Sequence, residues 1–437
     1  MNFNIYIKTF GCKVNQYDSE IIRENLSLDK NFKFTNNYRD ANLFIVNSCF
    51  VTEKAENEVL KEVRKFSKLG EVIVTGCFNK SLNIENVYIL NLNKEANVRE
   101  FIYNIYDINV KENIYKKKIE TFSDRTRVFV KVEEGCNKFC SYCIVPYLRG
   151  NAKSRNADDI IDEVNILIDN GYKEIVLTGT ELGYYGLENG ENITTLLKKL
   201  ISINKNFRIR LSSIDPEFFT DELINLMKES DKICPHIHLP LQSGSDKILE
   251  KMRRRYDISY YIDRVNYFKE NIKNGTITTD IIVGFPFEED EDFEKTTEVI
   301  KKVKFLKCHI FPYSKRDGTV ASRYIYSINK EIIKDRLKII KEVSSKIREE
   351  VIKFYNNKEL ILLPEYEMND KLYGFTENYI RVSIDNRYKI NNFYKIYLQT
   401  IENNVEYGIV LNEFSYPAIE GGENKKCQQS TEEKVKI

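Results

Sequence analysis

Three cysteines in the middle of the chain have a spacing that is typical of an iron–sulfur site. Cys136, Cys140 and Cys143 form a Cys-x3-Cys-x2-Cys string. Three thiolates on one short loop hold three irons of a 4Fe–4S cluster and leave the fourth iron free for a substrate or cofactor. A structural zinc ion would need a fourth ligand, and no histidine or other cysteine stands nearby in the sequence. We therefore expect these three residues to ligate an open cluster.

Three further cysteines share another position, because each follows a strand-like apolar run in the first hundred residues. They are Cys12, Cys49 and Cys77. Ligands of a doubly wound parallel sheet lie beyond the carboxyl ends of its strands, so we expect these thiols to converge although they are far apart in sequence. Three soft thiolates suit a second iron–sulfur cluster. The alternative interpretation is three unrelated small, buried cysteines.

The elements that position the second cysteine set predict an α/β domain over residues 1–115. Expected strands and helices alternate, as strand 4–8, helix 18–28, strand 42–46, helix 53–69 and strand 71–75. Such an alternation indicates a parallel, doubly wound sheet that is covered by helices on both faces.

The middle of the chain, residues 122–355, alternates in the same way. The expected strands are 127–132, 174–178, 207–212, 237–239, 276–283 and 306–311. The expected helices between them are 158–170, 194–203, 216–228, 258–271 and 291–303. Six β/α units predict a partial (β/α)6 barrel, whose active site lies at the carboxyl ends of its strands. Small and polar residues stand at those ends, namely Gly179, Glu181, Gln242, Ser243 and Gly284.

The pattern changes again after a long charged helix over 331–354. Short alternating runs at 360–363, 372–375, 379–384, 393–400 and 406–411 predict a small β-barrel over residues 356–414. Residues 358–413 carry a net charge of −3, which gives no sign of a phosphate-binding surface. Aromatic residues such as Tyr373, Phe375 and Tyr379 are candidates for stacking on bases, although strand aromatics are more often core residues. A polar tail is expected over 415–437.

Composition narrows the class of protein. The chain has 437 residues, of which 42% are hydrophobic and 30% charged, and this excludes a disordered chain. No apolar run is long enough for a membrane helix, and the first twelve residues are typical of a strand rather than a signal peptide. Nine cysteines without an export signal predict a reducing, cytoplasmic setting and no membrane partner. The net charge of +1 neither predicts nor excludes a nucleic-acid partner.

Taken together, these motifs resemble the radical S-adenosylmethionine methylthiotransferases over residues 1–413. A Cys-x3-Cys-x2-Cys string after a barrel strand marks the radical enzymes, and a preceding domain with three strand-end cysteines narrows the resemblance to the methylthiotransferases. Further supporting strings are His238 to Ser245, Arg253 to Tyr256, Thr279 to Pro286 and Phe311 to Thr319. The string from Gly11 to Glu20 and that from Leu177 to Gly186 are similar to the MtaB branch of this family.

The resemblance implies an activity and its cofactors. The MtaB branch adds a methylthio group to carbon 2 of N6-threonylcarbamoyladenosine beside the anticodon of tRNA. Cys136, Cys140 and Cys143 would hold the cluster that cleaves S-adenosylmethionine to a 5′-deoxyadenosyl radical. Cys12, Cys49 and Cys77 would hold a second 4Fe–4S cluster that carries the sulfur, and a second S-adenosylmethionine would supply the methyl group. The C-terminal barrel resembles the RNA-binding TRAM domain.

The resemblance also implies residues that contact S-adenosylmethionine. They are Tyr142, Gly179, Glu181, Gln242, Ser243 and Gly284. Tyr142 is expected near the adenine, with a core position as the alternative. Two positions depart from the family: Phe287 precedes Glu288 where Gly-Glu is common, and Glu181 stands where the MtaB branch often has histidine.

Several alternatives stay open on the sequence alone. The substrate could instead be isopentenyladenosine in tRNA or an aspartate of a ribosomal protein, as in sister branches of the family. The chain could also be an iron–sulfur RNA-binding scaffold without activity, or a zinc protein. We expect His236 and His238 to be structural and Cys234 and Cys308 to be core residues. The electron donor, the sulfur source and the oligomeric state are not fixed by the sequence.

Overall fold

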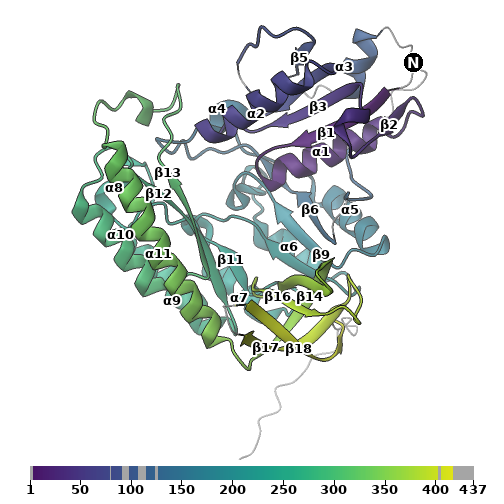
Figure 1. Cartoon of the computed structure of the whole chain (residues 1–437). Helices are drawn as coiled ribbons and strands as arrows, with labels where there is room; N and C mark the ends of the chain where they lie inside the picture. The colour runs from purple at the N-terminus through teal and green to yellow at the C-terminus, as the bar shows by residue number, and fades with distance from the viewer. Residues whose placement is uncertain are drawn as a thin grey trace, which may run out of the picture.

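The computed structural model describes residues 3–78, 80–90, 98–106, 115–123, 126–401 and 405–416. These residues form an N-terminal parallel sheet with helices, a central open barrel of parallel strands, and a small closed β-barrel at the C-terminal end. Figure 1 shows the N-terminal sheet at the top, the open barrel in the middle and the small barrel at the bottom.

The N-terminal sheet has five strands in the order β2-β1-β3-β4-β5. Their bounds are β1 Phe3–Thr9, β2 Phe32–Phe34, β3 Leu43–Ser48, β4 Glu71–Gly76 and β5 Val87–Ile89. Every neighbouring pair is parallel. All carboxyl ends therefore lie at the same edge of the sheet, which is the edge that the cysteines follow.

Helices cover both faces of this sheet, because the strands are apolar on both sides. Leu43 and Ile45 of β3 pack with α1 (Lys13–Leu26) and α3 (Val98–Ile105). Phe44 and Val46 pack on the other side with α2 (Glu53–Phe66). The doubly wound α/β arrangement predicted from the sequence is confirmed.

The predicted helix at 18–28 is wrong in its start. Helix α1 begins at Lys13, directly after Cys12, whose extended backbone forms the N-cap. The first turn carries polar residues that face the interior, and Asn15 is fully buried there. A search for apolar periodicity passes over such a turn. Strands β2 and β5 were also missed, because three residues are too few to show an alternating pattern.

Six parallel strands build the central open barrel in sequence order. They are β6 Arg127–Lys131, β9 Glu174–Thr178, β10 Arg208–Leu211, β11 His236–His238, β12 Thr276–Val283 and β13 Lys307–Pro312. Strands β6, β9 and β10 form one sheet and β11, β12 and β13 another. Parallel bridges from Ile209 to Ile233 and from Ser213 to His238 join the two.

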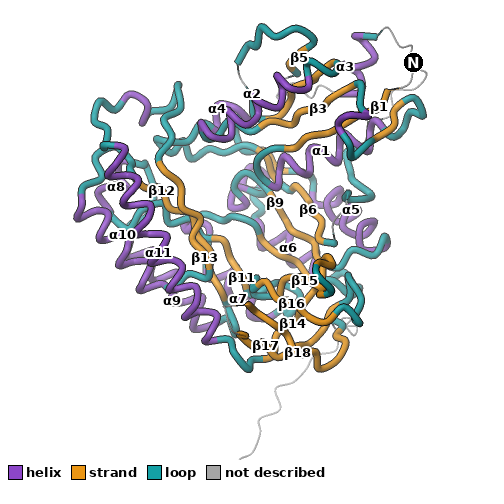
Figure 2. Tube along the Cα trace, in the orientation of Figure 1, coloured by secondary structure: helices purple, strands orange, loops and turns teal. Residues whose placement is uncertain are grey.

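Helices pack on the outside of these strands; α11 packs against α10 and along β13, at the left of Figure 2. The outer helices are α5 Ala157–Asp169, α6 Ile193–Ile201, α7 Asp221–Glu229, α9 Ile258–Asn271, α10 Asp290–Val303 and α11 Lys330–Phe354. Most begin at a side-chain cap, for example Asn156 of α5 and Asp257 of α9. The predicted helix at 216–228 is split, because Thr220 caps α7 after a short 3-10 turn at Pro216–Phe218.

The C-terminal barrel closes in the order β14-β15-β16-β18-β17. Its strands are β14 Glu359–Met368, β15 Lys371–Thr376, β16 Arg381–Asp385, β17 Phe393–Ile401 and β18 Val405–Phe414. Tyr416 is buried against Phe393 and Phe414, while 417–437 of the expected tail lie outside the described residues.

Buried charges attach this barrel to the central domain. Glu174 at the start of β9 is fully buried and accepts hydrogen bonds from Arg208 and Arg210 of β10, the two Nε donors lying 2.7 Å away. The same two arginines donate to backbone carbonyls of the barrel, Arg208 to Ile361 at 2.9 Å and Arg210 to Thr376 at 3.0 Å. Each guanidinium therefore joins the two domains.

No helix in the described part of the chain is long and apolar enough to cross a membrane.

The three architectures expected from the sequence, a parallel α/β sheet, an open β/α barrel and a small β-barrel, are all present.

Candidate functional site

The loop with Cys136, Cys140 and Cys143 leaves the carboxyl end of β6 through a two-stranded ribbon. β7 (Glu133–Glu134) pairs with β8 (Lys153–Ser154) just before it. Gly135 then turns the chain at φ +90°, where a Cβ atom would lie 2.1 Å from the carbonyl oxygen of Asn151. The Cys136 amide donates to the carbonyl of Gly150 at 3.1 Å. Backbone contacts therefore fix the start of the loop, and only glycine fits its turn.

Ser141 fixes the other side of the loop. Its amide donates to the carbonyl of Met252 at 3.0 Å, and its hydroxyl donates to the carbonyl of Lys251 at 2.7 Å. The Ser141 carbonyl accepts from the amide of Ala321 at 2.7 Å. The three cysteines are thus held between the first barrel strand, the end of α8 (Asp246–Lys251) and the segment after β13.

Burial dominates the electrostatics of this first triad. Burial, together with the neighbouring thiol of Cys140, raises the pKa of Cys136 and of Cys143 to about 12. Three thiols that oppose each other's ionisation lie close together. Such a site favours three thiolates only when a cation neutralises them, which is the donor set of an iron–sulfur cluster.

The second triad lies at the carboxyl edge of the N-terminal sheet, as the sequence predicts. Cys12 caps α1, Cys49 follows β3 and Cys77 follows β4. Gly11 has φ +92°, and a Cβ atom there would lie 2.7 Å from Cβ and 3.0 Å from Sγ of Cys49. This close approach of Cys49 requires glycine at position 11.

The thiols of the second triad are also affected by burial. Burial raises the pKa of Cys49, and it raises that of Cys77 to about 11.

Asn15 ties the ends of the strands around this triad. Its amide nitrogen donates to the carbonyls of Phe10 at 2.8 Å and Ser48 at 2.7 Å. Its Oδ1 lies 3.7 Å from Sγ of Cys12 and 4.0 Å from Sγ of Cys77. One buried side chain thus contacts two of the three cysteines and the backbone before the third.

Within the described ranges, no three histidine, cysteine, aspartate or glutamate side chains are arranged to hold one metal ion. A zinc ion takes four ligands that all contact it at about 2.3 Å for sulfur. A 4Fe–4S cluster instead places each thiolate on its own iron, so its ligands stand further apart. Three thiols are the donor set of a 4Fe–4S cluster with one open iron, whereas a structural zinc ion would need a fourth ligand at each triad.

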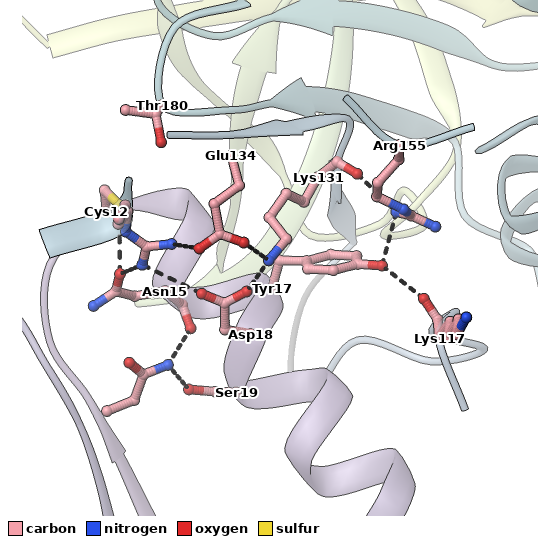
Figure 3. Close-up of polar contacts among 12 residues, drawn as sticks. Cys12, Asn15, Tyr17, Asp18, Ser19, Lys117, Lys131, Glu134, Arg155 and Thr180 are labelled. Atoms are coloured by element: carbon pink, nitrogen blue, oxygen red, sulfur yellow. Dashed lines mark hydrogen bonds and ion pairs between the residues drawn. The ribbon is translucent and has the colours of Figure 1, made fainter. Parts of the chain in front are cut away.

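A polar network at the domain junction links α1 of the N-terminal domain to β6 and β7 of the central domain (Figure 3). Lys131 of β6 contacts Asp18 of α1 at 2.5 Å and Glu134 at 2.8 Å. Tyr17 of α1 accepts from Arg155 at 2.9 Å, the donor being Nη1. These residues line a cleft of about 720 Å³ between α1 and the strands β6 to β8.

Comparison with known proteins identifies both halves of this arrangement. Residues 130–300 match the model of the radical SAM superfamily, and residues 4–96 match the uncharacterized protein family UPF0004. The threonylcarbamoyladenosine tRNA methylthiotransferase MtaB of Thermotoga maritima is 37% identical over 400 residues, 86% of this chain and 90% of that protein. MtaB of Bacillus subtilis is 35% identical, with 86% and 88% covered. A tRNA-2-methylthio-N(6)-dimethylallyladenosine synthase of Fervidobacterium nodosum is 35% identical, with 84% and 89% covered.

The chain belongs to the family of radical S-adenosylmethionine methylthiotransferases. Among solved structures, the radical S-adenosylmethionine methyltransferase TsrM of Kitasatospora setae matches with a TM-score of 0.54 at 13% identity. That match covers 74% of this chain and 77% of TsrM, and it shows a shared fold. Membership of the family implies a 4Fe–4S cluster and S-adenosylmethionine, and it makes the chain an enzyme.

Two predicted contacts of this methylthiotransferase lie at the end of β9. A Cβ atom on Gly179 would stand 2.6 Å from Oε2 of Glu133, so the glycine permits a close approach. Glu181 is buried, and its Oε1 accepts from the amides of Gly183 at 3.2 Å and Asp215 at 2.8 Å. Burial, with the neighbouring charge of Asp215, raises the pKa of Glu181 to about 7. The Oε1 atom of Glu181 therefore holds the backbone at Gly183 and Asp215 in place.

Three more predicted contacts lie at the ends of the later strands. Gln242 adopts φ +65° and its amide donates to the carbonyl of Asp280 at 2.8 Å. Ser243 is fully buried. A Cβ atom on Gly284 would lie 2.6 Å from Cγ1 of Ile333 in α11, so helix packing already explains that glycine.

The aromatic residues of the predicted site pack with one another. Tyr142 lies edge-on to Phe285 at 6.4 Å and packs on a small apolar cluster with Met252. This packing supports the alternative interpretation, in which Tyr142 is a core residue. Phe287 stacks on Tyr326 at 5.4 Å with the rings 12° apart.

Other expected structural residues are hydrogen-bonded or buried. His236 and His238 both contact the hydroxyl of Thr278, at 3.1 and 2.9 Å. Cys234 is buried between β10 and β11, and Cys308 of β13 packs against the main core.

Sequence reasoning missed Arg149 and Glu133, and it named Arg254 only as part of a family string without connecting it to a cysteine. Arg149 and Arg254 each contact a cysteine, and neither could be paired with its cysteine from the sequence because the partners lie on different elements. Glu133 is also buried beside Glu181, and burial raises its pKa to about 9. Its only signal in the sequence is its position at the end of the strand before the cysteine loop.

Proposed function

We propose that this enzyme adds a methylthio group to carbon 2 of N6-threonylcarbamoyladenosine beside the anticodon of tRNA. The names of the Thermotoga maritima and Bacillus subtilis relatives support this substrate. The motifs from Gly11 to Glu20 support the same branch of the family. A tRNA substrate and eight free cysteines in the described part of the chain support a cytoplasmic enzyme.

The observation that carries the proposal is the meeting of two cysteine triads at one domain junction. Arg149, six residues after Cys143, donates from Nε to Sγ of Cys77 at 3.0 Å. Burial is the main cause that raises the pKa of Cys143, and the Cys77 thiol of the second triad lies near enough to raise it as well. A reaction that activates a C–H bond at one cluster and delivers sulfur from another requires this adjacency.

The residues of the chain have separate parts in this proposal. Cys136, Cys140 and Cys143 would bind the radical cluster, and Cys12, Cys49 and Cys77 would bind a second cluster. When bound, the two groups with S-adenosylmethionine supply the radical and sulfur chemistry that side chains lack. Tyr142, Gly179, Glu181, Gln242, Ser243 and Gly284 remain the proposed contacts to S-adenosylmethionine. An electron donor and a sulfur source complete the reaction.

One face of the C-terminal barrel supports tRNA binding. Phe375 and Tyr379 stack on each other at 4.8 Å and Tyr379 stacks on His236, so both belong to the domain junction. Tyr373 instead stacks on the exposed Tyr366 at 5.6 Å, with Arg381 5.2 Å from the Tyr373 ring. An aromatic pair beside a guanidinium is suited to stacking on unpaired bases.

The test is nucleoside mass spectrometry of bulk tRNA from a host that lacks its own methylthiotransferases and expresses this chain. We expect 2-methylthio-N6-threonylcarbamoyladenosine with the natural chain. We expect no such product after Cys12→Ala, Cys49→Ala and Cys77→Ala together, although S-adenosylmethionine cleavage should persist in the purified variant. Product from that triple variant would contradict the second cluster.

A second candidate substrate has one supporting observation. The relative named tRNA-2-methylthio-N(6)-dimethylallyladenosine synthase is 35% identical over 386 residues, nearly as similar as the MtaB proteins. A methylthio group on isopentenyladenosine, in the same experiment, would keep the chemistry and replace the proposed substrate.

A further inference from the structure

Each cysteine triad has one thiol that accepts a hydrogen bond from a buried arginine. In the second triad, Nε of Arg149 lies 3.0 Å from Sγ of Cys77. In the first triad, Nη1 of Arg254 lies 3.2 Å from Sγ of Cys140. Both arginine side chains are only 5% exposed, so neither charge is screened by water.

Arg149 is held in place by three further acceptors. Its Nη1 donates to Oε1 of Glu134 at 2.5 Å, and its Nη2 donates to Oδ1 of Asn15 at 2.5 Å and to Oδ2 of Asp18 at 3.3 Å. Asn15 and Asp18 belong to the N-terminal domain, while Glu134 belongs to the central one. The guanidinium is therefore fixed across the junction, with its Nε directed at Cys77.

Arg254 is fixed by a separate set of residues. Its Nη2 pairs with Asp215, and its Nε contacts the hydroxyl of Tyr256 at 3.2 Å. That hydroxyl donates to the carbonyl of Pro240 at 2.9 Å. Asp215 also pairs with Lys138 at 2.5 Å. The two arginines share no partner among these contacts, so each can be changed without removing a ligand of the other.

A hydrogen bond to a ligand sulfur changes the chemistry of the cluster it serves. Reduction adds negative charge to an iron–sulfur cluster, and N–H donors to its sulfurs stabilise that charge and raise the reduction potential. A donor that is itself a cation makes a stronger bond than a neutral one. Fixed, dry guanidinium groups have this effect without reorganising when the electron arrives.

We propose that Arg149 and Arg254 are positioning residues that set the reduction potentials of the two clusters separately. Arg149 acts through Cys77 and Arg254 acts through Cys140. The Arg149 half rests on the second cluster of the proposed function, whereas the Arg254 half rests only on the radical cluster that the family implies.

The test isolates each cluster before its potential is measured. Alanine at Cys136, Cys140 and Cys143 leaves only the second triad, and alanine at Cys12, Cys49 and Cys77 leaves only the first. Each reconstituted protein is titrated with dithionite, and the reduced cluster is quantified by electron paramagnetic resonance. Iron and sulfide are counted in every sample, and circular dichroism shows whether each variant folds.

In the background that keeps the second triad, Arg149→Gln should reduce the ratio of reduced to oxidised cluster at least tenfold at a fixed potential. For a one-electron couple this is a fall of about 59 mV. Arg149→Lys keeps the charge but not the Nε donor, so it should give a smaller fall. Arg254→Gln should leave this cluster unchanged. In the other background, Arg254→Gln should lower the potential and Arg149→Gln should not.

Arg155→Gln is the matched control. Arg155 is a mostly buried arginine at the same junction that pairs with Glu163 at 2.7 Å and bonds to Tyr17, and among the described residues it makes no hydrogen bond to a thiol. Equal shifts from Arg155→Gln and Arg149→Gln would show a general loss of charge and overturn the proposal. Unchanged potentials in folded Arg149 and Arg254 variants would also overturn it. A second triad that binds no iron would overturn the second cluster and the Arg149 half together, and the Arg254 half would stand or fall by its own titration.

Discussion

Replacing Glu174 should loosen the C-terminal barrel from the central domain. Glu174 is fully buried, and its carboxylate accepts from Arg208 and Arg210 within 2.6–3.1 Å. Both guanidinium groups also donate to carbonyls of β14 and β15, such as those of Ile361 and Thr376. Glu174→Ala leaves two buried cations without their carboxylate at the surface between the two domains.

The expected magnitude follows from the burial of the group. Removing one partner of a buried ion pair costs about 3–5 kcal/mol. Burial alone would raise the pKa of Glu174, but Arg210 and Arg208 outweigh it and hold that pKa well below its usual range, so the carboxylate is ionised at neutral pH. At about 1.4 kcal/mol per tenfold change, local opening of the barrel should become at least about a hundredfold more frequent.

Hydrogen exchange of peptides from β14 to β18 is the assay. We expect faster exchange there and little change in β1 to β5 for Glu174→Ala, with a smaller effect for Glu174→Gln, which keeps one acceptor. Glu222→Ala is the control, because the Lys198–Glu222 pair at 2.9 Å is about half exposed and such pairs contribute at most about 1 kcal/mol. Equal exchange in the Glu174→Ala and Glu222→Ala proteins would refute the reasoning.

Three further predictions concern the other parts of the enzyme. Gly11→Ala should lower the iron bound by the second triad, because its Cβ would meet Cys49 at 2.7 Å; full iron content on analysis would contradict this. Tyr366→Ala should weaken tRNA binding about tenfold in a filter-binding assay, since an exposed aromatic stack is lost, whereas unchanged affinity would move the RNA-binding face elsewhere. Burial raises the pKa of Glu377 to about 7, so folded protein holds a proton that unfolded protein releases near pH 4.5. The contribution of Glu377 to stability should therefore fall as pH rises from about 4.5 to 7 and stay constant above that, and Glu377→Gln should flatten this part of a urea-unfolding profile taken across pH.

Much of the architecture could be predicted from the sequence, because long apolar strands and amphipathic helices alternate regularly over 4–311. The strand-end position of Cys12, Cys49 and Cys77 was enough to expect them at one edge, since all neighbouring strands of that sheet are parallel. The start of α1 was not predictable in this way. Its first turn buries Asn15 for hydrogen bonding beside the single apolar residue Val14, so it shows little apolar periodicity.

Contacts between elements were beyond reach of the sequence. Arg149 stands 72 residues from Cys77, and Arg254 stands 114 residues from Cys140, so neither spacing carries a signal. The pairing of Glu174 with Arg208 and Arg210 depends on which strands are neighbours and on where the C-terminal barrel docks. The role of a single charged residue can be assigned only when the fold shows which residues it contacts.

The central claim is methylthiolation of threonylcarbamoyladenosine by two adjacent clusters. The most direct measurement is a competition in one reaction, with purified reconstituted enzyme, S-adenosylmethionine, a reductant, and equal amounts of tRNA carrying threonylcarbamoyladenosine and tRNA carrying isopentenyladenosine. Mass spectrometry of the nucleosides should show the methylthio group on threonylcarbamoyladenosine, together with 5′-deoxyadenosine. A methylthio group only on isopentenyladenosine, or cleavage of S-adenosylmethionine without any methylthio product from enzyme with both clusters, would contradict the account.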